Sequence, residues 1–157
     1  MAIAISAAIT AGLAFVQSRM TQHQINSSMR PWVGSTEHGF TLSSHGVITA
    51  MVKNFGTLPA QKVRMWHGAQ LEPFTVRQLL ELPRRETKDE AVIMPSAEKS
   101  VTLLLPEYDR VVRERLKVGL ALIVEYEYAN NKQATYHLAG QFNPSTREQG
   151  IDYEFTT

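Results

Sequence analysis

Leu120-Ala-Leu-Ile-Val-Glu-Tyr-Glu-Tyr128 is the clearest strand pattern in this chain of 157 residues. Every second side chain from Leu120 to Tyr128 is apolar or aromatic, whereas Glu125 and Glu127 fall on the opposite face. An Asn-Asn pair at 130–131 follows and favours a turn into a second strand at 135–139. The stretch therefore predicts an antiparallel hairpin.

Four further short runs have a strand-like composition, and Gly, Pro and Asn residues separate them. They lie at residues 47–53, 62–67, 100–105 and 153–155. This arrangement predicts a mainly β fold, in which residues 30–157 form an antiparallel β-sandwich head of about seven strands. Within the head, Trp32 and Trp66 are expected to pack in the core; the alternatives are a membrane-interface anchor for Trp32 and an exposed contact residue for Trp66. Residues 106–116 are expected to form one short helix.

The amino-terminal residues differ in character, because the first eighteen carry no charged side chain. Eighteen helical residues rise about 27 Å, close to the ~30 Å hydrocarbon core of a bilayer. No Gly or Pro interrupts residues 13–30, and Pro31 ends the run. The sequence therefore predicts an N-terminal hydrophobic α-helix over residues 1–29, a transmembrane segment continued as a stalk. A cleaved secretory signal is the alternative interpretation.

Apolar residues of this expected helix recur at steps of three or four and share one face. They are Ile5, Ile9, Leu13, Val16 and Met20. The stripe fits two arrangements: contact with lipid and with the head, or a helix–helix seam in an assembly. Arg19 and Arg30 flank the carboxyl end of the helix and favour a cytoplasmic head.

An Asn-x-Gly-x-x-Pro-Ala motif, made by Asn54, Gly56, Pro59 and Ala60, joins two of the predicted strands. An asparagine amide can bond nearby backbone, and a glycine can take the positive φ of a tight turn. Proline fixes φ as the chain leaves the turn, and a small alanine can pack beneath it. We interpret the motif as a structural turn and not as a ligand site.

The composition excludes several classes of function. Sixteen basic and fifteen acidic residues give a net charge of +1, which offers no electrostatic case for a nucleic-acid partner. The absence of cysteine excludes thiol catalysis and disulfides. No zinc-type histidine spacing, nucleophile elbow or phosphate-binding glycine loop is present, so we assign no catalytic, cofactor or metal residues. His67 and His137, both on predicted strands, are the remaining candidates for an enzyme or metal site.

Three segments together resemble a known group of proteins: Arg30-Pro31-Trp32-Val33, the motif at 53–60, and Met94–Thr102. The chain resembles small membrane-anchored proteins of bacteria and archaea, and its head is similar to the cell-adhesion-related, immunoglobulin-like domains of prokaryotic surface proteins. This resemblance implies an immunoglobulin-like sandwich over residues 30–157 and an extracytoplasmic head. The charges of Arg19 and Arg30 favour the opposite, a cytoplasmic head. The side of the membrane on which the head lies is therefore not decided by the sequence.

Besides an enzyme or metal carrier built on His67 and His137, the sequence leads to two functional hypotheses. The first is a non-enzymatic, membrane-anchored interaction or assembly module, such as an accessory subunit of a membrane complex or a surface binding module. Its partners would be the lipid bilayer and another protein, or copies of itself through the N-terminal helix. The second is a filament subunit similar to archaeal pilins or archaellins, whose N-terminal helices bundle in the filament core.

Overall fold

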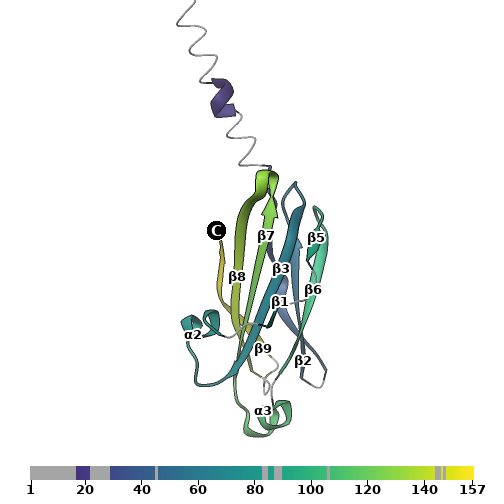
Figure 1. Ribbon diagram of the computed structural model, residues 1–157. Coiled ribbons are helices and arrows are strands. Elements are labelled where there is room, and N and C mark those ends of the chain that lie inside the picture. The colour runs from purple at the N-terminus through teal and green to yellow at the C-terminus, as the bar shows by residue number, and fades with distance from the viewer. Residues whose placement is uncertain are drawn as a thin grey trace, which may run out of the picture. The chain divides into compact units, whose positions relative to one another are not determined.

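The computed structural model describes residues 17–21, 29–44, 46–82, 85–86, 90–105, 107–143, 146 and 148–157. The chain divides into two compact units, Met1–Arg30 and Pro31–Thr157, which are described separately. The second unit is mainly β and contains two sheets (Figure 1).

One sheet has three antiparallel strands in the order β1-β2-β6. Its strands are β1 (Val33–Ser44), β2 (Val47–Asn54) and β6 (Glu98–Leu104). The other sheet has six strands, ordered β4-β3-β7-β8-β9 with β5 also pairing with β3. Its strands are β3 (Ala60–Leu71), β4 (Arg85–Glu86), β5 (Ala91–Ile93), β7 (Val118–Tyr128), β8 (Lys132–Asn143) and β9 (Glu148–Thr156).

The strands β4 and β5 raise the number of strands in the described residues to nine, where about seven were expected. Both lie within residues 81–99, whose charged composition predicts a solvated loop, and both are only two or three residues long. Each pairs with the edge of β3 that β7 leaves open, where the backbone groups of β3 need partners. Pairing with a long neighbour thus overrides the local composition.

The core lies between the two sheets and is built by the alternation seen in the sequence. Leu120, Leu122, Val124 and Tyr126 point inward from β7 and are at most 3% exposed, whereas Glu125 is exposed. Inward-facing residues of β1, β2, β3, β6 and β8 complete the same cluster. Burial of these apolar surfaces is the main stabilising term of the head.

A five-residue helix, α2 (Val76–Leu80), packs on the outer face of the six-stranded sheet beside β7 and β8 (Figure 1). Its first turn is fixed by a capping box, in which Thr75 and Gln78 bond each other's backbone N–H groups. Leu79 is buried with Ala121 and Ala139 of the sheet. A Cβ on Gly119 would lie 2.5 Å from Leu79 Cδ2, so glycine permits this close approach.

A second helix, α3 (Tyr108–Glu114), lies at the end of the sandwich opposite to the β7–β8 turn (Figure 1). It falls inside the helix expected over residues 106–116. Val111 is buried in the core, while Arg110 bridges Glu107 and Glu114 on the exposed side. Between β7 and β8 the chain makes a short 3-10 turn, Ala129–Asn131.

The expected N-terminal transmembrane helix is a wrong prediction. None of the helices in the described part of the chain is both long enough and apolar enough to cross a membrane. The membrane, transmembrane and single-pass character inferred from residues 1–29 is therefore not supported.

The stripe expected on that helix falls largely outside the described residues. This is the case for Ile5, Ile9, Leu13 and Val16. Met20 lies in the described segment 17–21 and is 61% exposed. The helix–helix seam therefore stays a prediction.

Candidate interaction surface

The Asn54 side chain is fully buried at the carboxyl end of β2 and satisfies four backbone groups. Its Nδ2 donates to the carbonyl oxygens of Leu58 (2.7 Å) and Ile93 (3.0 Å). Its Oδ1 accepts from the N–H groups of Gly56 (2.9 Å) and Trp32 (3.1 Å). One amide thus joins the start of β1, the β2–β3 turn and the end of β5.

The other residues of the motif lie around this amide in different ways. Ala60 is fully buried as the first residue of β3, and Pro59 is half-buried. Gly56 does not take the positive φ expected of it. Among the described residues, the glycines with positive φ are Gly39 and Gly46. The turn instead uses the Gly56 N–H as a donor to Asn54, which closes the turn without a left-handed residue.

His67 and His137 do not converge. His137 stands in the same cross-strand row as Trp66, through Ile123 of β7. His67 is the neighbour of Trp66 along β3 and therefore belongs to the opposite face of the sheet. Within the described ranges, no group of three or more His, Asp or Glu residues is close enough to hold a metal ion.

Neither tryptophan lies in the central core, contrary to the expectation. Trp32 is 50% exposed beside the Asn54 turn, where its carbonyl oxygen accepts a 2.7 Å bond from Phe55 N–H. Trp66 is half-buried on the outer face of β3. The alternation in β3 puts Met65, and not Trp66, into the core. A run of six residues gives the period of a strand but not which face is inward.

The outer face of the six-stranded sheet carries both aromatic and charged side chains. We define the outer face by three cross-strand rows of outward-facing side chains. The first row crosses β3, β7, β8 and β9. The other two lie nearer to the β7–β8 turn and cross β3, β7 and β8. The aromatic row contains Trp66, Ile123, His137 and Phe155. The central charged row contains Arg64, Glu125 and Thr135, and the end row contains Lys62, Glu127 and Gln133.

The aromatic row borders the part of the sheet that α2 covers. Phe155 is 49% exposed, and Tyr153, two residues earlier on the same face of β9, is 37% exposed. The two rings lie 6.4 Å apart at an interplanar angle of 37°. Large aromatic side chains are therefore presented to solvent from the edge strand of the sheet.

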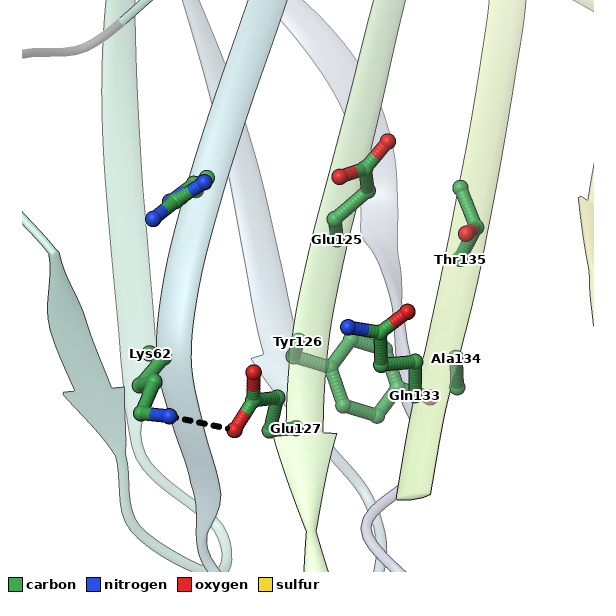
Figure 2. A pocket seen from close by; sticks show the side chains of 8 residues that line it. Lys62, Glu125, Tyr126, Glu127, Gln133, Ala134 and Thr135 are labelled. Carbon is green, nitrogen blue, oxygen red and sulfur yellow. Dashed lines mark hydrogen bonds and ion pairs between the residues drawn. The ribbon is translucent and has the colours of Figure 1, made fainter. Parts of the chain in front are cut away.

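The two charged rows form a shallow concavity of about 190 Å³. Figure 2 shows its lining from three strands: Lys62 from β3, Glu125 and Glu127 from β7, and Gln133 and Thr135 from β8. The ring of Tyr126 belongs to the core on the inner face of the sheet, and the side chains that line the concavity on the outer face are polar or charged.

Lys62 reaches the concavity because β3 is irregular at this point. The register of β3 against β7 shifts between Gln61 and Arg64, and Lys62 takes a positive φ of 45°. Its Nζ lies 2.7 Å from Glu127 Oε2 (Figure 2). The hydrogen bond and charge of Glu127 raise the pKa of Lys62, and the bond from Lys62 lowers the pKa of Glu127, helped by Gln133.

Arg64 is engaged by an acidic residue from outside the three rows. Its Nε donates to Glu90 Oε1 at 2.9 Å, and its Nη2 contacts the same oxygen. Glu90 lies just before β5, so this pair ties the β4–β5 connection to β3. The surface therefore joins exposed aromatic rings to a set of fixed charges.

The outer face could not be predicted from the sequence, because strand register decides which residues share that face. The alternation of Arg64 with Trp66 and of Thr135 with His137 is visible in the sequence. Their alignment with Phe155 is not, because it requires the pairing of three strands. The helix α2 was also missed, although Thr75-x-x-Gln78 is a capping-box signature.

Comparison with known proteins gives a family but no function. No curated protein matches the chain. One family model matches residues 1–146, and its description is a domain of unknown function, DUF8453. Since this match covers most of the 157 residues, the chain belongs to the DUF8453 family.

Proposed function

We propose that this protein is a non-enzymatic interaction module, and that the outer face of its six-stranded sheet binds a protein partner. The observation that carries the proposal is the pair of exposed aromatic rings, Tyr153 and Phe155, beside the charged rows. Aromatic residues are enriched at the energetic centres of interfaces, and flanking charges orient the partner.

The size of the outer face sets the expected strength of binding. Four strands spaced about 4.8 Å apart, with about six residues each, present roughly 400 Å². A standard interface uses about 800 Å² on each partner. The interaction we propose is therefore weak and transient, unless the partner also contacts neighbouring elements such as α2.

Site-specific photo-crosslinking in cells tests this proposal. A photoreactive phenylalanine derivative replaces Phe155 in the full-length chain, and a matched chain carries it at Thr102. Thr102 is exposed on β6, in the other sheet. We expect a discrete crosslinked protein from position 155 and none of the same mass from position 102. Equal products from both positions, or none from position 155, would contradict the proposal.

A further inference from the structure

The described ion pairs on and beside the outer face leave one carboxylate over, because the rows hold two basic and two acidic side chains and Glu90, beside them, is a third acid. Lys62 pairs with Glu127, and Arg64 pairs with Glu90. Within the described part of the chain, no ion pair of 4.0 Å or less includes the Glu125 carboxylate. Glu125 thus leaves one negative charge at the centre of the face.

The residue placed to neutralise this charge points elsewhere. Arg64 stands directly opposite Glu125 in the β3–β7 register. Its guanidinium nevertheless makes both of its described contacts to Glu90. Glu125 is exposed, and Thr135 stands opposite it on β8 (Figure 2). A carboxylate and a hydroxyl side by side offer acceptors to a cationic donor.

An aromatic surface lies within reach of the same position. Ile123, the next outward-facing position on β7, lies about 7 Å from Glu125 by strand geometry and is only 2% exposed, and the half-buried Trp66 stands opposite it. A lysine or arginine side chain has an aliphatic stem of comparable length. Its stem can pack on the aromatic row while its charge meets Glu125, and a cation near the Trp66 ring gains further attraction.

We propose that the partner of the outer face presents a lysine or arginine flanked by apolar residues, and that Glu125 binds this cation. The inference rests on the proposed function, because it names the chemistry of the partner for the same surface. Charge complementarity selects this occupant: the two ion pairs are neutral, and the uncompensated charge is negative.

The probe for the experiment is a 12-residue peptide that alternates valine with lysine. Two matched peptides carry glutamine or glutamate in place of lysine. Each is titrated into the ¹⁵N-labelled full-length chain at low salt, and amide shifts of β3, β7 and β8 are followed by NMR. We expect shifts around Glu125, Thr135 and Trp66 with the lysine peptide alone. Equal shifts with the glutamine or glutamate peptide would overturn the proposal, and so would no shift with the lysine peptide.

Variants separate the cation site from the docking surface itself. Glu125→Gln removes the charge at nearly constant size, and we expect about a five-fold loss of affinity, typical of one partly screened pair. Glu98→Gln removes an exposed carboxylate from the other sheet and should leave the affinity unchanged.

Phe155→Ala tests the surface independently of the charge. If Phe155→Ala weakens binding while Glu125→Gln does not, the interaction surface stands and the cation site is refuted. If neither variant weakens binding, the proposed function fails as well. In the absence of peptide, amide shifts that grow with protein concentration and disappear in Glu125→Gln would show that a second copy of the chain binds this face. That result would overturn the proposed partner.

Discussion

The phenol hydroxyl of Tyr136 donates a 2.9 Å hydrogen bond to the Glu154 carboxylate. The same carboxylate oxygen accepts from the hydroxyl of Ser35 at 3.1 Å. Tyr136 lies on β8, Glu154 on the edge strand β9, and Ser35 on β1 of the other sheet. These three side chains join the two sheets along one side of the sandwich.

This cluster predicts a loss of stability at alkaline pH. Burial, and then the bond to Glu154, raise the pKa of Tyr136 above its usual value near 10. Above about pH 10 the unfolded chain loses the Tyr136 proton while the folded chain keeps it, so stability falls as pH rises. We expect urea midpoints between pH 8 and 11 to fall more steeply in the wild type than in Tyr136→Phe. Tyr153→Phe, an exposed control, should keep the wild-type slope. If the urea midpoints of wild type and Tyr136→Phe fell in parallel with pH, this role of Tyr136 would be contradicted.

Replacing the buried amide of Asn54 should be strongly destabilising. Asn54→Ala leaves two carbonyl oxygens and two N–H groups without their partner at a buried position. We expect a loss of about 3 kcal/mol in the free energy of unfolding, measured by urea denaturation. Thr57→Ala, an exposed change in the same turn, is the control. A loss below about 1 kcal/mol for Asn54→Ala would mean that water or a rearranged turn replaces the amide.

Two glycines on neighbouring strands should respond differently to the same substitution. A Cβ on Gly140 of β8 would collide with the carbonyl oxygen of Gly150 on β9, whereas a Cβ on Gly150 meets only Gln141 Cγ at 3.9 Å. We therefore expect Gly140→Ala to cost about 2 kcal/mol through displacement of β9. Gly150→Ala should stay within about 0.5 kcal/mol of the wild type. Thermal unfolding of both variants measures the difference, and equal midpoints would refute the β8–β9 register.

The capping box of α2 gives a fourth prediction. Thr75→Ala removes the side-chain oxygen that accepts from Gln78 N–H, and typical N-cap losses are about 1 kcal/mol. Thr75→Ser keeps that oxygen and should restore most of the stability. Since α2 covers Ala121, hydrogen exchange at this residue should accelerate in Thr75→Ala and not in Thr75→Ser. Unchanged exchange would show that α2 is held by Leu79 packing alone.

The sequence predicts the strands of the head well where one face is buried against the other sheet. The pattern from Leu120 to Tyr128 gives both the strand and its inward face, because the glutamates mark the outside. Trp66 was misplaced since large aromatic residues occur on either face, and only packing decides. The short strands β4 and β5 depend on pairing with β3 and have no local signal.

The candidate surface could be predicted only in fragments. Arg64 and Glu125 are visible as polar positions of their strands, but their opposition follows from the bulge at Lys62. The diversion of Arg64 to Glu90 depends on how the β4–β5 connection lies against β3. The uncharged opening residues, in contrast, gave a strong hydropathy signal for a membrane helix that the described residues do not contain.

The bond between Ser35 and Glu154 spans 119 positions of the chain. During synthesis, β1 emerges from the ribosome long before Glu154 exists, and it must wait without this partner for several seconds at usual elongation rates. The three-stranded sheet can pair earlier, since β2 and β6 follow sooner. We therefore expect late closure of the β1–β9 side, and a nascent head that depends on chaperones more than its size alone suggests.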